Sequence, residues 1–389
     1  MPPRPPAWTP FALGFRPFFL TAGVAAAALI ATWLAVYRGA LGLPAYYDVI
    51  TWHGHEMVFG YAVAVIAGFL LTAVRNWTGV PTPTGGLLAL LVALWLAGRL
   101  AALLPALLPR EWIAAIDLAF LPALALSLAG PLLRRPQPGQ VVFLPLLLGL
   151  TAANAMVHLQ MLGITAVTAR PGLYFAVDLI VLIIAVVGGR VLPFFTQRGV
   201  GAAPRRWPAV EWAVWGTTGA VALVDLFALA PAVAIPICAA GAVAHAVRLA
   251  GWYDRRIWGV PLLWVLHLGY GWLAVGFALK AAVAAGLLIP MVGLHALTVG
   301  GIGVLTLGMM ARVALGHTGR ALQASAPMAV AFALINAAAA ARALFAAALP
   351  AWYAQTILLA GALWLAAFAI FVAEFAAILL RPRVDGQPG

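Results

Sequence analysis

The sequence has very few charged residues. Only 8% of its 389 residues are Asp, Glu, Lys or Arg, whereas 65% are hydrophobic and the mean hydropathy is +1.05. A soluble domain carries about 25% charged residues, so this chain lacks the polar surface to cover itself in water. The composition excludes a soluble enzyme, a disordered protein and a nucleic-acid-binding protein, and it predicts an integral membrane protein.

Cysteine is nearly absent, because Cys238 is the only one. A single cysteine excludes an internal disulfide, a cysteine-ligated iron–sulfur cluster and the C-x-x-C-H attachment of haem. Any redox centre must therefore be held by His, Met, carboxylate or non-covalent contacts.

Long apolar runs predict about twelve transmembrane spans. Backbone groups inside a bilayer must be satisfied within the segment, so each run of about 20 residues is expected to be a helix. The sequence thus predicts an all-α, polytopic transmembrane helix bundle that forms a single integral-membrane domain over residues 1–389. The expected spans lie near residues 17–37, 51–74, 85–104, 112–133, 140–163, 172–192, 209–229, 232–250, 258–284, 291–313, 324–348 and 351–380.

Positive charge is distributed unevenly between the predicted loops. The net charge is +12, and most of the arginines fall in the N-terminus, the even-numbered loops and the C-terminus. The odd-numbered loops hold only Arg38, Arg110 and Arg170. The positive-inside rule then predicts that both termini are cytoplasmic, and it explains the net charge without a nucleic-acid partner. No internal repeat is evident between the two halves.

Six of the seven histidines lie in predicted spans. An ionisable side chain at membrane depth is costly and is a functional candidate by default, although it can also hydrogen-bond a neighbouring helix. His53, His55, His158 and His295 are expected towards the outer side, and His267 near mid-membrane. Such a group is typical of a buried metal or haem site, because imidazole ligates transition metals and haem iron.

The densest candidates lie between Trp52 and Met57. His53 and His55 point about 200° apart on a regular helix, so they would serve two sites unless the helix is distorted. His53, Glu56 and Met57 share a face that offers nitrogen, oxygen and sulfur ligands, which suits copper. The alternative is an interfacial belt of Trp and His. The candidate metal ligands are His53, His55, Glu56, Met57, His158, His267 and His295.

Other residues are candidates for binding haem. His267 and Tyr270 share a helix face, which favours a redox site slightly over a buried hydrogen-bonded pair. The glycines that follow His295 permit close helix packing, which we favour for them, or the approach of a planar cofactor. Basic side chains near helix ends either bind haem propionates or form the positive-inside edge. The candidate cofactor-binding residues are Arg16, His267, Tyr270, Arg190, Arg312, His317 and Arg320.

The remaining intramembrane groups have weaker assignments. Asp178, Asp225 and Glu374 are acids that would form a proton route. His245 and Cys238 are predicted to be structural.

Several segments resemble the NnrS family, in family order from the first span to the tenth. The resemblance implies a multi-span bacterial inner-membrane protein that contains haem and copper and is linked to nitric oxide metabolism. It does not imply which histidine binds which metal. The similar segments are Gly14–Phe19, Trp52–Gly60, Gly68–Gly79, Gly188–Thr196, His267–Tyr270, His295–Gly300 and Leu315–Arg320.

The hypothesis we favour is a haem- and copper-binding inner-membrane protein that handles nitric oxide, in nitrosative-stress response or denitrification. The haem is expected to be non-covalent and b-type, and the partners are nitric oxide, the lipid bilayer and a membrane electron donor. Whether the protein is an oxidoreductase stays open. The alternative is a secondary transporter of a metal or small anion, which predicts internal repeats and a midplane site.

Overall fold

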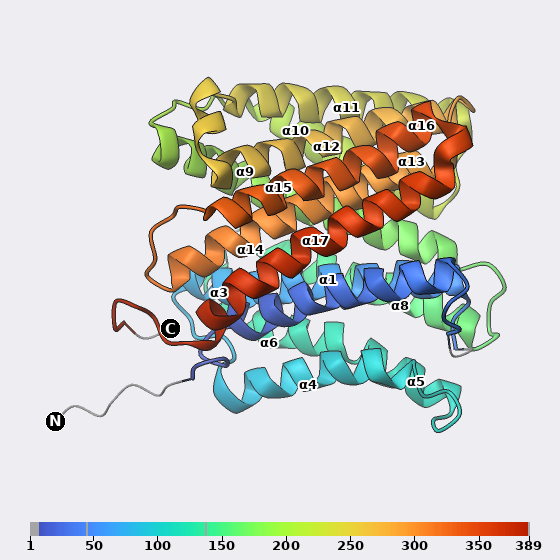
Figure 1. Cartoon of the computed structure of the whole chain (residues 1–389), viewed down its shortest axis with the longest axis horizontal. Coiled ribbons are helices and arrows are strands. Elements are labelled where there is room, and N and C mark those ends of the chain that lie inside the picture. Colours follow the sequence, from blue (N-terminus) through green and yellow to red (C-terminus); the bar gives the residue numbers. More distant parts are fainter. Residues whose placement is uncertain (1–7, 44–45, 137, 388–389) are drawn as a thin grey trace. The chain divides into compact units, whose positions relative to one another are not determined.

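The computed structural model describes residues 8–43, 46–136 and 138–387. These residues form helices joined by short loops, and no strand occurs among them (Figure 1). The helical elements are α1 (Phe15–Tyr37), α2 (Val49–His55), η1 (Glu56–Ala62), α3 (Val63–Thr78), α4 (Gly85–Ala101), α5 (Arg110–Leu118), α6 (Phe120–Arg134), α7 (Pro138–Val141), α8 (Phe143–Met161), α9 (Ala169–Val200), α10 (Pro208–Leu226), α11 (Pro231–Trp252), η2 (Arg255–Gly259), α12 (Pro261–Ala284), α13 (Pro290–His295), η3 (Ala296–Gly303), α14 (Val304–His317), α15 (Ala326–Ala339), η4 (Ala340–Phe345), α16 (Ala346–Ala348), η5 (Pro350–Trp352) and α17 (Tyr353–Leu380).

Each of the twelve predicted spans corresponds to a helix or to helices that follow one another directly. In the described part of the chain, ten of these segments are long and apolar enough to cross a membrane. The other two are α4, which is apolar but has 17 residues, and α10, which carries Glu211 and Asp225 near its ends. The prediction of an all-α, polytopic helix bundle is confirmed, whereas the cytoplasmic location of the termini stays a prediction.

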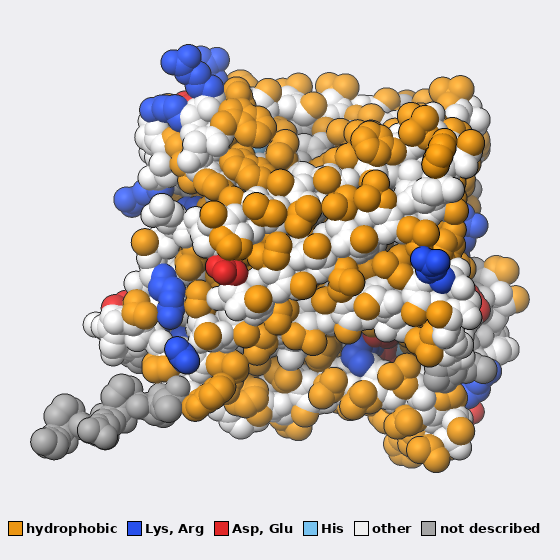
Figure 2. Space-filling model, viewed as in Figure 1, with side chains coloured by type: hydrophobic (Ala, Val, Ile, Leu, Met, Phe, Trp, Pro, Cys, Tyr) orange, Lys and Arg blue, Asp and Glu red, His pale blue; other side chains and the backbone are white. Residues whose placement is uncertain are grey.

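The exposed surface of the helices is apolar. Figure 2 shows hydrophobic side chains spread over the helices in view, and large helical side chains such as Leu126 and Trp212 are at least 70% exposed. A soluble protein rarely leaves so much contiguous apolar surface in water. This surface is the one that a lipid bilayer would cover.

The chain forms two compact units. Unit 1 comprises residues 1–176, 310–322 and 371–389, and unit 2 comprises residues 177–309 and 323–370. The boundaries fall within helices α9, α14 and α17. That the two units act as a single membrane domain stays a prediction.

Small residues let helices approach closely within each unit. In unit 1, Gly68 on α3 faces Phe18 and Phe19 of α1, and a Cβ on this glycine would lie 2.9 Å from both side chains. In unit 2, Gly276 on α12 faces Leu297 of η3, and a Cβ on this glycine would lie 2.4 Å from the leucine side chain. Transmembrane helices gain little from the hydrophobic effect on packing, so such close van der Waals contacts hold them together.

Three segments are π-helical, namely η1, η3 and η4. The first begins directly after His55 and the second directly after His295. A π-helical turn inserts an extra residue and rotates the side chains that follow, and it is frequent at functional sites. The helix is therefore distorted in the segment that carries most of the ligand candidates. A distortion of this kind would allow neighbouring side chains there to face one site.

Candidate metal centre

Polar and ionisable side chains from four membrane segments meet inside unit 1. The side chains from the membrane segments are buried except that of Arg99, which is 11% exposed, although the segments themselves are strongly apolar. We call this group the unit 1 cluster; its members are His55, Glu56, Arg99, Asp117, Asn154 and His158, with Tyr46 and Tyr47 from the loop before α2.

The start of α2 and the π-helix position the first two members. The Asp48 side chain caps α2 by accepting hydrogen bonds from the backbone N–H groups of Ile50 and Thr51, both at 3.0 Å. Consecutive residues of a regular helix diverge by about 100°. His55 and Glu56 both have right-handed helical backbone angles, yet their side chains turn toward each other, with His55 Nδ1 and Glu56 Oε1 3.1 Å apart.

Two imidazoles and a carboxylate of this cluster converge. Asp117 Oδ2 lies 3.2 Å from His55 Nε2 and 2.9 Å from His158 Nε2, and one ligand atom from each of these residues lies within 4.8 Å of the others. Among the described residues, this is the group of three or more such ligands that could hold a metal ion. Imidazole with carboxylate suits zinc, copper or iron.

Two tyrosines contact the imidazoles, Tyr46 at the nitrogen of His158 opposite Asp117 and Tyr47 at the nitrogen of His55 that also faces Asp117. Burial raises the pKa of Tyr46 to about 12 and raises the pKa of Tyr47 well above its usual value, so both phenols stay protonated. The Tyr46 hydroxyl lies 2.8 Å from His158 Nδ1, and the Tyr47 hydroxyl 3.2 Å from His55 Nε2. Because a hydroxyl both donates and accepts, Tyr46 satisfies either tautomer of His158.

His55 has hydrogen-bond acceptors around both ring nitrogens. Its Nδ1 faces the Glu56 carboxylate, while its Nε2 lies 2.9 Å from Asn154 Oδ1 as well as beside Asp117. The Asn154 orientation follows from its amide, which donates to Asp117 Oδ2 at 2.8 Å. With the His55 proton on Nδ1, the lone pair on Nε2 faces two oxygen acceptors and a single donor, the Tyr47 hydroxyl, so a bound cation would relieve the contacts with the two acceptors.

The net charge of the cluster also favours the binding of a cation. The Arg99 guanidinium pairs with Glu56, with Nε 3.1 Å from Oε2, and with Asp117 Oδ1. One positive charge therefore faces two carboxylates, and neutral imidazoles leave a net charge of −1. A buried unpaired charge is costly, so the cluster favours binding one more cation.

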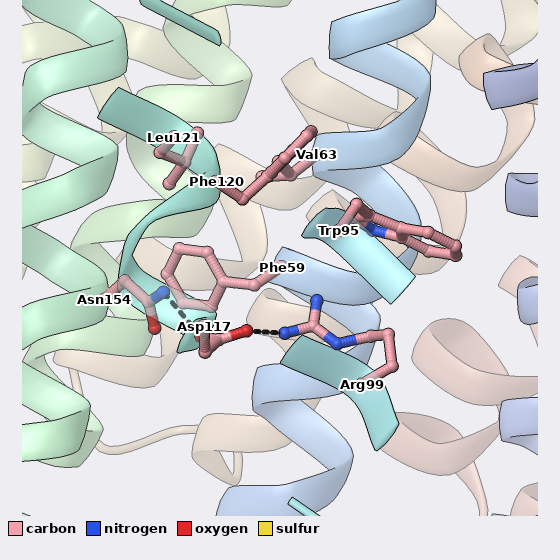
Figure 3. A pocket seen from close by; sticks show the side chains of 8 residues that line it. All are labelled: Phe59, Val63, Trp95, Arg99, Asp117, Phe120, Leu121 and Asn154. Atoms are coloured by element: carbon pink, nitrogen blue, oxygen red, sulfur yellow. Dashed lines mark hydrogen bonds and ion pairs between the residues drawn. The ribbon is translucent and has the colours of Figure 1, made fainter. Parts of the chain in front are cut away.

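A small pocket adjoins the Arg99–Asp117 ion pair (Figure 3). Its cavity volume is about 10 Å³, close to the lower limit for holding one water molecule. The ion pair and Asn154 form its polar side. The apolar wall consists of Phe59, Val63, Trp95, Phe120 and Leu121.

The other candidates of the Trp52–Met57 segment do not share this arrangement. His53 stacks on Trp33 of α1, with ring centroids 4.2 Å apart and planes at 21°, so it faces away from His55 as the helical geometry predicts. Met57 is half-buried. The structure thus joins His55 and Glu56 with His158, and it leaves His53 against another helix.

His267 and His295 lie in unit 2, at different levels of one helix pair. Gly269 and Gly276 of α12 face Leu305 and Leu297 respectively, so α12 runs antiparallel to η3 and α14. At 1.5 Å per residue, this register separates the two histidines by roughly 15 Å along the helix axis. Within unit 2 they cannot ligate one metal ion together.

Both histidines have the same tautomer. His267 Nδ1–H donates to the Leu263 carbonyl at 2.9 Å, and His295 Nδ1–H donates to the Met291 carbonyl at 2.8 Å. The Nε2 lone pair is therefore on the distal side of each ring, as in histidines that bind a metal through Nε2. His267 Nε2 lies 3.3 Å from the Thr196 hydroxyl.

The glycines after His295 are occupied by helix packing. A Cβ on Gly300 or Gly303 would lie 2.5 Å from the indole of Trp272 or Trp364, respectively. The structure thus gives these glycines the packing role that we favoured for them, and they do not offer room for a planar cofactor.

The predicted pair of His267 and Tyr270 is divided between two networks. The Tyr270 hydroxyl accepts a hydrogen bond from Arg248 at 2.9 Å and lies 3.0 Å from His245 Nδ1. His267 bonds instead to α9 and to its own helix. His245, predicted to be structural, is thus part of a buried hydrogen-bond network with Tyr270.

The basic candidates have different environments. Arg16 is fully buried, and its Nη1 donates to the carbonyls of Leu379 and Arg381 at 3.1 and 2.6 Å, so it caps the C-terminal end of α17. His317 packs against Phe15. Arg312 is buried in α14 and Arg320 follows that helix in unit 1, whereas Arg190 is half-buried on α9 in unit 2.

Sequence reasoning missed half of the unit 1 cluster. Arg99, Asp117 and the two tyrosines were not among the candidate ligands or cofactor-binding residues. The available signal was the presence of an acid and a base in neighbouring predicted spans, because such charges pair with one another in membranes.

The comparisons with known proteins agree with this architecture. A family model described as NnrS protein matches residues 9–383, which is nearly the whole chain, and confirms the resemblance found in the sequence. No curated protein matches the chain.

Proposed function

The chain belongs to the NnrS family, and from this we propose that it is a haem- and copper-binding inner-membrane protein that handles nitric oxide in nitrosative-stress response or denitrification. Membership in the family links the chain to nitric oxide, and the apolar helices place it in a lipid bilayer. The metal sites are the part that we infer from individual residues.

We assign copper to His55, Asp117 and His158. The observation that carries this assignment is the convergence of their ligand atoms around a position that lacks one positive charge. The donor set fits copper, because imidazole is a preferred ligand of that metal. Bound there, copper would supply a redox-active Lewis acid to which nitric oxide can bind.

The surrounding residues of the cluster orient the ligands and exclude water. Arg99 holds Asp117 and Glu56 in place through ion pairs, and Glu56 in turn accepts from His55 Nδ1, which fixes the orientation of that ring. Such outer partners raise the basicity of a ligating histidine. The apolar wall of the adjoining pocket suits a small uncharged diatomic better than an ion.

We assign haem to His267 or His295, each of which has a tautomer suited to axial ligation through Nε2. Haem would supply ferrous iron with an open position for nitric oxide. Arg190, Arg312, His317 and Arg320 remain candidates for the propionates. Arg16 is left out, because its donors already serve the end of α17.

The test uses the full-length chain purified from cells supplied with haem and copper. We expect copper in metal analysis, haem bands in the dithionite-reduced minus oxidised spectrum, and nitric oxide binding to the reduced protein. His55→Ala and His158→Ala should each lower copper affinity at least tenfold. His53→Ala, two residues away but stacked on Trp33, is the matched control and should keep copper.

Haem content separates the two assignments, because the copper variants should retain it and His267→Ala or His295→Ala should lose it. Unchanged copper in both His55→Ala and His158→Ala would overturn the copper assignment. A colourless, metal-free preparation would overturn the proposed function and favour a transporter.

A further inference from the structure

A second buried ionic group lies in unit 2. Lys280 Nζ on α12 lies 3.4 Å from Asp178 Oδ1 on α9 and forms a closer ion pair with Asp225 Oδ2 on α10. We call these three residues the unit 2 triad. Asp178 is only 1% exposed, so the group lies within the packed helices rather than on their surface.

The triad has one carboxylate too many for its cation. Lys280 offsets one acid, and within the described part of the chain no other charged side chain pairs with the three residues. The buried Asp178 Oδ2 has no hydrogen-bond partner, and the Asp178 and Asp225 carboxyl groups lie side by side at the same ammonium group. A hydrogen bond between two carboxyl groups needs a proton, because two carboxylates are both acceptors.

The helices packed around the triad bring no competing ligand. From α11 the thiol of Cys238 faces the group, and from α13 Gly293 approaches the backbone of Lys280, where its Cβ would be 3.1 Å away. Among the described residues no imidazole reaches this site, and the ammonium group already occupies the place of a cation. A proton is therefore the ligand that fits the remaining charge and the orphaned oxygen.

We propose that the unit 2 triad is a membrane-embedded proton-binding site, which holds one exchangeable proton between Asp178 and Asp225 beside Lys280. This inference does not rest on the proposed function, since neither copper nor haem is involved. It assigns two of the three acids that the sequence placed on a proton route. The third, Glu374, is exposed on α17 in unit 1.

The site opens to one end of unit 2. The side chains of Asp225 and Lys280 are 16% and 13% exposed, whereas that of Asp178 is 1% exposed. Asp225 is followed at once by the end of α10 and the loop to α11. Protons therefore reach the pair from the aqueous layer at that loop, through Asp225 first and Asp178 second.

The opposite direction is closed. Thr218, two turns before Asp225 on α10 and about 10 Å away along the helix, lies 3.0 Å from His245 Nε2. Phe277 stacks on His245 with ring centroids 5.0 Å apart. Since His245 Nδ1 is bonded to Tyr270, both ring nitrogens have partners, and the apolar ring of Phe277 covers a face of the imidazole. The triad is thus a one-sided binding site.

Infrared spectroscopy of the full-length protein in nanodiscs tests the proposal. With ¹³C-labelled aspartate, a protonated aspartic acid gives a C=O band that shifts with the label and in D₂O. We expect one such acid from the triad at pH 7, well above the ordinary aspartate pKa of about 3.9. Asp178→Asn should remove this band, because Asp225 is then fully balanced by Lys280.

Variants of Lys280 distinguish proton binding from a misfolded site. Lys280→Met removes the only cation, so both acids should be protonated and the triad's band should double. Lys280→Arg should leave it unchanged, and the double variant Asp178→Asn/Lys280→Met should regain a single acid. Asp254→Asn, at an exposed ion pair with Arg256, is the matched control and should not alter the band.

The proposal is overturned if the wild-type difference spectrum contains no triad band, if Asp178→Asn retains it, or if the double variant fails to restore it. Restoration in the double variant cannot arise from unfolding, because an exposed Asp225 would be ionised at pH 7.

Discussion

Two membrane segments, one from each half of the chain, share a backbone design and differ in chemistry. In residues 49–78 and 290–317, a short helix ends in histidine, a π-helix follows, and a longer helix completes the span. Five identical residues recur 240 positions apart at matching places in these segments and the turns that end them. They are His55 and His295, Gly60 and Gly300, Gly68 and Gly308, Thr78 and Thr318, and Gly79 and Gly319.

The shared residues build the backbone, and the residue after the histidine changes the chemistry. Glu56 follows the first histidine and pairs with Arg99, whereas Ala296 follows the second. The first segment therefore organises acids and a base around its imidazole, whereas the second has an alanine at the place of Glu56. The π-helix and the glycines thus serve packing in both segments, and the ionic cluster belongs to the first segment.

The largest expected difference in stability between variants of the two halves comes from the loss of a buried charge. Arg99→Met would leave two buried carboxylates without a counter-charge, and removing one partner of a buried ion pair costs about 3–5 kcal/mol. Arg342→Met in η4, where the arginine donates to the Tyr353 hydroxyl and not to an acid, should cost under about 1.5 kcal/mol. The free energy of unfolding in mixed micelles measures both.

A further substitution identifies the cause. Glu56→Gln added to Arg99→Met removes one of the stranded charges and should recover a substantial part of the lost stability. Equal losses for Arg99→Met and Arg342→Met, or no recovery with Glu56→Gln, would mean that the unit 1 cluster does not differ energetically from an ordinary intramembrane arginine.

The second contrast uses the glycines at equivalent places in the π-helices. A Cβ on Gly300 would lie 2.5 Å from the Trp272 ring, whereas one on Gly60 would lie 2.9 Å from Glu56 Oε2 and 3.2 Å from Arg99 Cδ. The indole is rigid, so Gly300→Ala should cost about 1–3 kcal/mol through overpacking. Gly60→Ala should cost less stability, because flexible side-chain ends can move.

In Gly60→Ala, the displacement of the Glu56 side chain should change the affinity for copper instead. Displacing Glu56 disturbs the support of His55, so we expect copper affinity to fall about tenfold while Gly300→Ala leaves it unchanged. Copper titration of the two purified variants checks this. If the two alanines had the same effects on stability and copper, the functional difference between the segments would be refuted.

The sequence predicts the helices well because the bilayer imposes a strong length and hydropathy requirement. It also identifies His55 and His158 as candidates by their depth in the spans. It does not reveal that Tyr46 and Asp117 meet these rings, since that depends on the rotation of α5 and on the path of the loop before α2. Helix rotation is set by packing contacts between segments distant in sequence.

The π-helix is a second feature that the sequence does not reveal. On a regular helix Glu56 belongs to the face of His53 and Met57, and that face was expected to bind copper. In the structure the Glu56 side chain contacts His55 instead, at the point where η1 begins. The same irregularity obscures the internal similarity, because the shared residues are few and become apparent only once η1 and η3 are seen to begin at equivalent positions.

The smallest contrast concerns the turns that end the two segments. Gly79 and Gly319 have φ values of +68° and +73°, a left-handed conformation that costs another residue about 1–2 kcal/mol. Alanine at Gly79 meets no atom within 4 Å, so its whole cost is conformational, and asparagine should restore part of it. At Gly319 the new Cβ would also lie 2.7 Å from the Asp385 carboxyl, which pairs with Arg383.

The additional cost at Gly319 is expected to be small, because the Asp385 side chain is exposed and can move. Unfolding measurements on Gly79→Ala, Gly319→Ala and Gly319→Ala/Asp385→Ala separate the two contributions. Equal losses of stability in Gly79→Ala and in Gly319→Ala/Asp385→Ala would show that the shared cost comes from the backbone conformation. A Gly319→Ala loss that vanished with Asp385→Ala would instead show that the two turns resemble each other in shape without sharing the strain that glycine relieves.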